Sequence, residues 1–381
     1  MDFSWTPEQI ELKRAVAEFA GAELNAGVLE RDRAGEFPRE GWRKCADFGI
    51  LGLPFPAAYG GGDSDILTTI LVMETLGRAC RDNGLLFAIN AHMWSAEMPL
   101  HLMGTEAQKR KYLAPMCRGE IVSGNGSTEP DSGSDVFAMK TTAVRRGDRY
   151  VINGRKMFVT NAPVADALIL YATLDPSKGI RGLCAFIVEK GFPGFSLGKE
   201  ISKMGLRTSP MAEVILDDCE VPAENILGSE GAGMAAFNCS MEWERACILA
   251  SCIGTMERQL EECVAYARTR RQFGRPIGSF QSVSNRIADM KVRIETGRLL
   301  LYKIGWLAGA GKQAHVEAAM AKLYVSESFV QSCLDAVQIH GGYGYMTEFE
   351  QERMLRDAIS SRIYSGTNEI QRNLIARLLG L

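Results

Sequence analysis

The spacing of apolar residues changes twice along this 381-residue chain, and that change limits its fold more than any other feature. From residue 6 to about 118, apolar residues recur every three or four positions, as they do in amphipathic helices. Between about 121 and 225 the pattern becomes short runs rich in β-branched residues. After 233 the helical spacing returns in long segments, including 281–309 and 316–339. The sequence predicts a mainly α protein with a central β domain.

Turn residues within the β segment predict where its strands reverse. Arg146-Gly147-Asp148 and Asn153-Gly154 contain residues that tolerate the left-handed backbone of a tight turn, so we expect a hairpin at each. A chain of this length exceeds what one hydrophobic core supports. We expect three domains, with boundaries at 1–120, 121–228 and 229–381.

Charge and hydropathy argue against several classes of partner. The formal net charge is -3 with both signs mixed along the chain, which disfavours nucleic acid and a basic membrane surface as partners. No apolar run approaches the roughly 20 residues that span a bilayer. The first residues, MDFSWTPEQIELKR, lack the pattern of a signal peptide, so we expect a cytoplasmic protein.

Familiar metal and cofactor motifs are missing. The ten cysteines are scattered without a Cys-x-x-Cys pair, and the four histidines show no metal-binding spacing, so no metal site is predicted. Gly231-x-Gly233 lacks the third glycine of a dinucleotide fingerprint, and no Walker motif or Gly-x-Ser-x-Gly elbow is present. A Rossmann nicotinamide site and a hydrolase of the elbow type are therefore disfavoured.

Several polar, glycine-containing motifs remain, and each alone could be an ordinary loop, because such residues dominate turns. In chain order they are GSTEPDSGSD (126–135), KMFVTN (156–161), KMGLR (203–207), RRQFG (270–274), QIHGGYGY (338–345) and RIYSGTNEIQR (362–372). Taken together, in this order and at this spacing, they resemble the acyl-CoA dehydrogenase family over essentially the whole chain.

The resemblance implies an N-terminal helical domain, a β-barrel-like middle domain and a C-terminal four-helix bundle. It also implies FAD, a homotetramer, and oxidation of an acyl thioester between its α and β carbons. Position by position, it implies FAD contacts from Ser127, Thr128, Ser134, Phe158, Thr160, Arg270, Phe273, Gln281, Gln338, Gly341, Gly342, Thr367 and Glu369.

These implied contacts fall into groups. Ser127 and Thr128, with Ser134 nearby, match residues at the pyrimidine edge of the flavin, Thr160 matches a hydroxyl near its N5 atom, and Phe158 replaces a tryptophan of many relatives. Arg270, Phe273 and Gln281 match residues that reach the FAD of a neighbouring subunit, whereas Gln338, Gly341 and Gly342 match the adenosine-diphosphate side. The alternative for Arg270 is a solvated cation within the basic run 268–271.

The position of the catalytic base departs from the commonest pattern. In most relatives a glutamate stands where this chain has Ser365, and a hydroxyl cannot serve as a base at neutral pH. In the isovaleryl-CoA and long-chain types the glutamate lies instead on the long helix after the β domain, just before an arginine. Here that stretch reads MEWERA (241–246), so Glu244 matches the base, and we assign substrate contacts to Arg245 and Ser365. The alternative for Glu244 is an exposed acid in the first turn of a helix.

The reaction explains what such a carboxylate needs. The α proton of a thioester is weakly acidic, so the base must lie within hydrogen-bond reach, and burial should raise the pKa of Glu244 toward neutrality. Relatives that oxidise prolyl groups on carrier proteins also lack the C-terminal glutamate. We expect a short, branched or cyclic acyl group on the phosphopantetheine arm of a carrier protein or of CoA, with an electron-accepting flavoprotein. The alternatives are an oxidase that uses oxygen and a non-catalytic flavin-binding member of the family.

Overall fold

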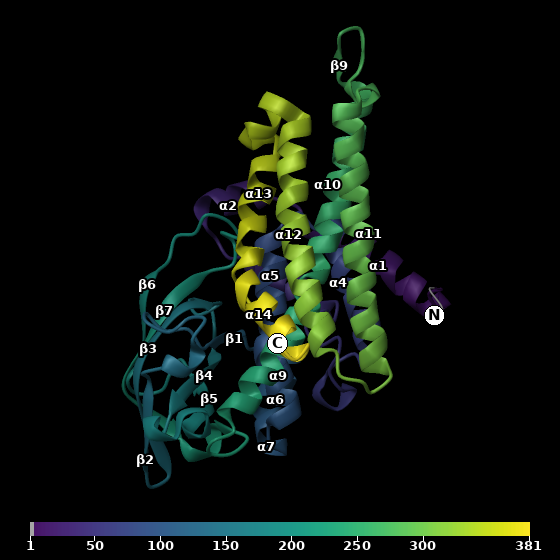
Figure 1. Cartoon of the computed structure of the whole chain (residues 1–381). Coiled ribbons are helices and arrows are strands. Elements are labelled where there is room, and N and C mark those ends of the chain that lie inside the picture. The colour runs from purple at the N-terminus through teal and green to yellow at the C-terminus, as the bar shows by residue number, and fades with distance from the viewer. Residues whose placement is uncertain (1–3) are drawn as a thin grey trace.

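The computed structural model describes residues 4–381 and confirms a mainly α chain with a central β domain (Figure 1). Short helices form the first part of the chain. They are α1 (Pro7–Glu23), α2 (Val28–Ala34), α3 (Arg39–Asp47), α4 (Ile66–Ala79), α5 (Asn83–His92), the π-helical turn η2 (Met93–Glu97), α6 (Met98–Met103), α7 (Glu106–Gln108) and α8 (Ala114–Cys117).

The middle part is an eight-stranded sheet in the order β6-β7-β3-β2-β4-β5-β8, with β1 paired to β4. Its strands are β1 (Ser123–Gly126), β2 (Thr142–Arg146), β3 (Arg149–Thr160), β4 (Ala167–Thr173), β5 (Leu183–Glu189), β6 (Phe195–Glu200), β7 (Met211–Pro222) and β8 (Ile226–Leu227). Most neighbours are antiparallel, whereas β4 pairs in parallel with both β1 and β2.

Long helices form the last part and stand beside one another in Figure 1. They are α9 (Gly233–Cys247), α10 (Ala250–Thr269), α11 (Gln281–Gly309), α12 (His315–His340), α13 (Gln351–Ile359) and α14 (Asn368–Leu378), with the hairpin β9 (Arg271–Gln272) and β10 (Arg275–Pro276) at one tip. The predicted division at 1–120, 121–228 and 229–381 remains our proposal for the domain boundaries. Within residues 4–381, no helix is both long and apolar enough to cross a bilayer.

The two predicted hairpins have different outcomes. β2 and β3 do meet in a hairpin at Gly147, whose φ is +63°. The prediction at Asn153-Gly154 was wrong, because both residues lie inside β3, where the register against β7 shifts in a bulge. A Cβ on Gly154 would stand 2.3 Å from the Thr141 hydroxyl oxygen. Glycine is required there by close packing rather than by a turn.

β4 shows how the sheet is joined to the helices. All seven of its residues are buried, which explains its continuous apolar run. Side chains alternate between the faces of a strand. Ile169 and Tyr171 therefore belong to the large core shared with the helices, whereas Leu168 and Leu170 belong to a second core inside the β domain.

Two glycines let α4 and α10 cross at close range. A Cβ on Gly77 would lie 1.9 Å from the Ser251 carbonyl oxygen, and one on Gly254 would lie 1.9 Å from the Glu74 carbonyl oxygen. Any larger side chain at either position would force the helices apart. This crossing packs the N-terminal helices against the C-terminal helices, next to the short link between α9 and α10.

Candidate active site

Glu244 lies in the last turn of α9, and its side chain is buried, with 8% of the residue exposed. The alternative of an exposed acid in the first turn of a helix is therefore wrong. The carboxyl end of a helix carries partial negative charge, so the helix dipole gives this carboxylate no stabilisation. A buried acid at this end of a helix is therefore not explained by stabilisation of the helix.

The partners of Glu244 are hydroxyl groups. The Ser365 hydroxyl donates to Glu244 Oε2 at 3.0 Å. The Ser95 hydroxyl, which donates to the Ala91 carbonyl oxygen, also lies near enough to this carboxylate to lower its pKa. Burial raises the pKa of Glu244 to about 7, against the opposing effects of Ser365, the Arg245 cation and Ser95. The group can therefore both accept and release a proton near neutral pH.

The turn that carries Ser365 is bound directly to α9. Ser365 and Gly366 both have left-handed backbones, with φ of +55° and +86°. Arg245 Nε donates to the Ser365 carbonyl oxygen at 3.2 Å, and Gln371 Nε2 donates to the Gly366 carbonyl oxygen at 2.9 Å. A serine with positive φ is strained, and these bonds hold it where its hydroxyl meets Glu244.

A polar cluster next to Glu244 escaped the sequence analysis. The Asn125 side-chain nitrogen lies 3.4 Å from the Ser95 carbonyl oxygen, 3.3 Å from the Tyr171 hydroxyl and 3.4 Å from the Ser240 hydroxyl. Ser240 stands four residues before Glu244 on α9, so the two share one face of the helix. That spacing was the one signal in the sequence that could have indicated the cluster.

The residues predicted to meet the flavin ring come from the loop after β1 and from the end of β3. Thr128 follows β1, and its carbonyl oxygen accepts a hydrogen bond from the Met157 N–H at 2.8 Å. Phe158 is 56% exposed and has a φ of +58°, so its ring lies on the surface beside Thr160 rather than in the core. Ser127, Thr128 and Thr160 are half-buried and Ser134 is exposed. An exposed aromatic ring beside hydroxyls suits a planar, polar-edged ligand.

A buried ion pair lies beneath this surface. Lys156 Nζ stands 2.7 Å from Glu129 Oε1, and both side chains are buried. Glu129 also accepts the backbone N–H groups of Lys140 at 2.6 Å and Thr141 at 3.0 Å. Burial alone would raise the pKa of Glu129, but the Lys156 ammonium and these hydrogen bonds outweigh it and lower the pKa. The loop after β1 is thereby tied to β3.

Two of the residues predicted for the adenosine-diphosphate side, Gly341 and Gly342, border a different hollow, with a volume of about 620 Å³, and so does Arg270, which was predicted to reach the FAD of a neighbouring subunit. Arg270, Gly341 and Gly342 line it, together with Tyr343, whose ring lies 5.6 Å from the Arg270 guanidinium carbon. A Cβ on either glycine would meet nothing within 4 Å, and Arg270 makes no ion pair with any residue in 4–381. An unpaired guanidinium beside open backbone suits a pyrophosphate. Gln338 is exposed nearby, two residues before the end of α12.

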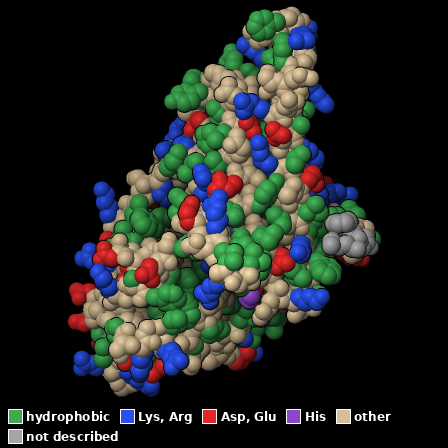
Figure 2. All heavy atoms as spheres, in the orientation of Figure 1, with side chains coloured by type: hydrophobic (Ala, Val, Ile, Leu, Met, Phe, Trp, Pro, Cys, Tyr) green, Lys and Arg blue, Asp and Glu red, His purple; other side chains and the backbone are tan. Residues whose placement is uncertain are grey.

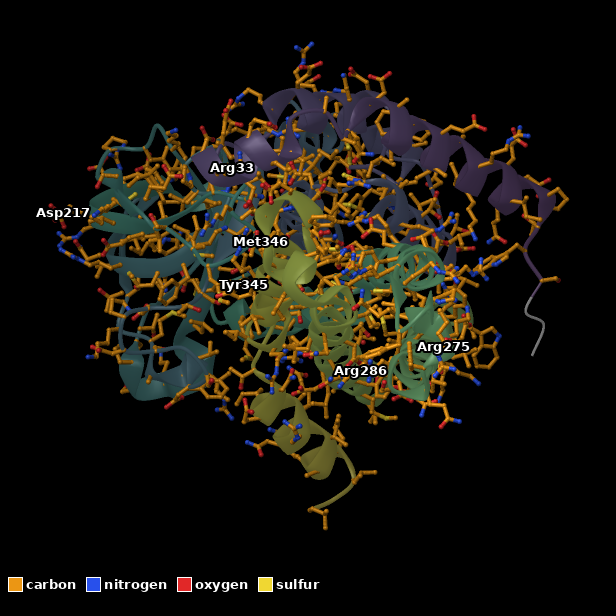
Figure 3. All side chains as sticks on the ribbon, turned by 90° about the horizontal axis from the view of Figure 1, so that it is seen from above. Arg33, Asp217, Arg275, Arg286, Tyr345 and Met346 are labelled. Carbon is orange, nitrogen blue, oxygen red and sulfur yellow. The ribbon has the colours of Figure 1, made fainter. Side chains whose placement is uncertain are left out.

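One chain does not bring these two groups together. The β9-β10 hairpin stands at the tip of the helical bundle, away from β1 and β3 (Figure 1). In the view from above, Arg275 of the hairpin and Asp217 of the β domain lie on opposite sides (Figure 3). Phe273, at the hairpin, is 92% exposed, and Figure 2 shows hydrophobic side chains at this tip.

Three further predicted contacts are separate again. Gln281 is exposed at the start of α11. The Thr367 hydroxyl caps α14 by accepting the Ile370 N–H at 3.4 Å, and Glu369 is exposed in the first turn of that helix. None of the three lines the hollow beside Arg270.

Comparison with known proteins defines the class of this chain, an oxidoreductase that acts on CH–CH bonds. The chain belongs to the acyl-CoA dehydrogenase family. Residues 6–120 match the N-terminal domain of that family, 124–219 its middle domain and 231–380 its C-terminal domain.

Individual relatives match along their full length. The L-prolyl-[peptidyl-carrier protein] dehydrogenase of a Serratia species is 42% identical, over 100% of this chain and 99% of the relative. The crystal structure of the prolyl acyl carrier protein oxidase AnaB superposes with a TM-score of 0.98 at 51% identity, covering 99% of this chain and 100% of that one. The structure of PigA with FAD and proline gives a TM-score of 0.98 at 41% identity, with both chains covered in full.

Proposed function

We propose that this protein is an FAD-dependent dehydrogenase that oxidises a short or cyclic acyl thioester between its α and β carbons. The observation that carries the proposal is Glu244, a buried carboxyl with a pKa of about 7 and hydroxyl partners only. A carboxylate kept for stability would have a cation or several N–H donors, as Glu129 has.

In this proposal Glu244 removes the α proton of the bound thioester. Ser365 orients the carboxylate, and Arg245 holds the turn that carries Ser365, so the contacts of both residues with the substrate stay a prediction. The surface formed by Ser127, Thr128, Phe158 and Thr160 would hold the flavin ring. When bound, FAD supplies the acceptor for the hydride that leaves the β carbon.

The acyl group is proposed to be small, with a prolyl group as the first candidate. The three relatives named above all carry prolyl or proline in their descriptions. A carrier protein is the preferred carrier, and CoA is the alternative because it ends in the same phosphopantetheine arm.

A second copy of the chain completes the FAD site in this proposal. Arg270, Phe273 and Gln281 belong to the β9-β10 hairpin and the helix ends beside it, away from β1 and β3 (Figure 1), and the Phe273 ring is 92% exposed. We therefore propose a homotetramer in which these residues, with Gln338, Gly341 and Gly342, serve the pyrophosphate and adenosine part of FAD. A cytoplasmic location belongs to the same proposal, since eight of the ten cysteines are buried thiols.

The electron acceptor has two candidates. We propose an electron-accepting flavoprotein, and the description of AnaB as an oxidase supports molecular oxygen as the second. Oxygen consumption with release of peroxide would favour oxygen, whereas a strict need for an added acceptor would favour the flavoprotein.

The test is an anaerobic titration of the FAD-loaded protein, followed by flavin absorbance. Prolyl-loaded carrier protein and isovaleryl-CoA are added separately to the parent, to Glu244→Gln and to the matched control Glu242→Gln, which changes a half-buried acid on the same helix. The proposal predicts bleaching by at least one thioester in the parent and in Glu242→Gln, and none in Glu244→Gln. A parent that no thioester bleaches would be a non-catalytic member of the family, and the proposal would be wrong.

A further inference from the structure

The cluster around Asn125 is polar where an acyl-binding site would be expected to be apolar. Asn125 is half-buried on β1, and Ser95, Tyr171 and Ser240 around it are buried, Tyr171 and Ser240 completely. Buried polar groups are costly unless they are paired, so such a cluster needs a purpose. It also adjoins the proposed base, because the Ser95 carbonyl oxygen contacts Asn125 and the Ser95 side chain lies near enough to Glu244 to lower its pKa.

The hydrogen bonds decide which way the Asn125 amide faces. The Ser95 carbonyl oxygen can only accept, so the amide nitrogen must be the atom that lies near it. The amide oxygen accepts no hydrogen bond from any residue in 4–381. The three distances from the nitrogen, 3.3 to 3.4 Å, are long, so the cluster is loosely bonded by itself.

Two hydroxyls add further capacity for hydrogen bonding. The Tyr171 and Ser240 hydroxyl oxygens both lie within 3.4 Å of the Asn125 amide nitrogen, and they share its two N–H groups with the Ser95 carbonyl oxygen. Within the described residues neither hydroxyl donates to another group. Burial raises the pKa of the Tyr171 phenol above its usual range, and the charge of Glu244 adds to that shift, which places this hydroxyl within electrostatic reach of the base. The cluster thus offers three acceptors near the Glu244 carboxylate: the amide oxygen of Asn125 and the hydroxyl oxygens of Tyr171 and Ser240.

Those acceptors match one feature of a cyclic α-amino acyl group. In a prolyl thioester the α carbon, which loses the proton, is bonded to a ring nitrogen that carries N–H donors. A group that presents its α carbon to Glu244 must place this nitrogen within one bond of the same carbon. We propose that Asn125, assisted by Tyr171 and Ser240, binds the ring nitrogen of the acyl group and so selects a prolyl group over a carbocyclic one. This inference rests on the proposed function and adds the residues that determine its substrate.

The position of Asn125 in the sheet agrees with this role. Asn125 lies in β1, and Ser127 follows the end of that strand two residues later. Ser127 belongs to the surface proposed for the flavin ring. The acyl group would then lie between that surface and α9, with its nitrogen toward the amide oxygen of Asn125.

The experiment compares two acyl groups of nearly equal shape on one carrier protein, prolyl and cyclopentanecarbonyl. A site that hydrogen-bonds a substrate N–H rejects the analogue that lacks it, so kcat/KM of the FAD-loaded parent should favour prolyl by about 100-fold or more. Asn125→Leu should reduce that preference at least tenfold, because only the prolyl reaction slows. Ser240→Ala should reduce it by about threefold to fivefold, since one weak hydrogen bond is lost. Asn153→Leu, at an exposed asparagine of β3, is the control and should keep the parent's preference.

Equal losses for both acyl groups in Asn125→Leu would overturn the inference, because they would mean that the residue only supports the fold or the flavin. If Asn125→Leu does not fold, as judged by thermal unfolding, Ser240→Ala decides the question in the same way. If the parent oxidises neither thioester, the proposed function fails, and calorimetric binding of the two loaded carrier proteins decides the inference by itself. In that case the inference requires that the parent binds the prolyl-loaded carrier protein more tightly than the cyclopentanecarbonyl-loaded one, and that Asn125→Leu binds the two equally. Equal binding of the two by the parent would overturn the inference.

Discussion

Glu129 in the β domain and Glu244 on α9 are buried to a similar degree, with 5% and 8% of each residue exposed, yet their surroundings differ. Glu129 faces the Lys156 ammonium and two backbone N–H groups, which lower its pKa. Glu244 accepts a hydrogen bond from the Ser365 hydroxyl, with the Ser95 hydroxyl nearby, and burial raises its pKa to about 7. One carboxyl stays ionised, and the other can exchange a proton.

The comparison teaches that the partners, more than the depth of burial, decide what a buried acid does. A cation with well-aligned N–H donors makes a carboxylate part of the framework. Hydroxyl partners compensate the cost of burying the charge only in part, so the pKa stays raised. A raised pKa is useful where the carboxyl must accept and release a proton. The predictions below test this difference.

The largest expected effect is on stability, from breaking the pair in the β domain. Lys156→Met leaves Glu129 buried without its cation, so the free energy of unfolding should fall by about 3–5 kcal/mol in urea denaturation. Lys140→Met removes an exposed lysine and should change little. Adding Glu129→Leu to Lys156→Met should restore part of the loss. A Lys156→Met protein as stable as the Lys140→Met control would mean that Glu129 does not depend on its cation.

Replacing Glu244, in contrast, is expected to raise the free energy of unfolding. Its folded pKa of about 7 lies above the unfolded value of 4.5, so its stabilising contribution is complete below pH 4.5 and is lost as the pH rises through 7. Glutamine does not ionise. Glu244→Gln should therefore match the parent near pH 4.5 and exceed its free energy of unfolding by about 3 kcal/mol at pH 8.

Glu242→Gln is the matched control on the same helix. It loses a partly exposed ion pair with His315, so its free energy of unfolding should stay within about 1 kcal/mol of the parent's across this range. The comparison needs unfolding free energies for the three proteins at several pH values. A constant difference between Glu244→Gln and the parent would show that the Glu244 carboxyl is not perturbed by burial.

The smallest effect is expected at Ser365. Its hydroxyl lowers the pKa of Glu244, so Ser365→Ala should move the rise of activity with pH upward by about 0.5–1 unit, as expected for one lost hydrogen bond. Most of the activity should remain at alkaline pH. Ser360→Ala, which removes a hydroxyl bonded to the Asp357 carbonyl oxygen, should leave the pH profile unchanged. A collapse of activity at every pH in Ser365→Ala would give the serine a larger role than orienting the base.

Much of the fold was predictable because its signals are local. The apolar spacing over 281–309 coincides with α11, and that over 316–339 falls one residue inside each end of α12. Asn153-Gly154 shows the limit of such signals. A glycine that close packing requires at a bulge cannot be distinguished, from the sequence, from a glycine that a turn requires. The domain boundaries are similarly local inferences and stay a prediction.

The site was predictable only where one motif contained it. MEWERA indicated Glu244, and the absence of an acid at Ser365 directed attention there. Its partners come from distant parts of the chain: Ser95 from the π-helical turn and Ser365 from the turn before α14. Asn125 shares no motif with either. Contacts of this kind depend on how the elements pack, which local spacing does not encode.

The central claim is that Glu244 takes the α proton, and single-turnover kinetics test it most directly. The rate of flavin bleaching by prolyl-loaded carrier protein is measured from pH 5.5 to 9, with protium and with deuterium at the α carbon. We predict a parent rate that rises through an apparent pKa near 7, slows with α-deuterium, and falls roughly 10³-fold in Glu244→Gln at pH 8. A Glu244→Gln protein that keeps the parent's rate and pH profile would contradict the account.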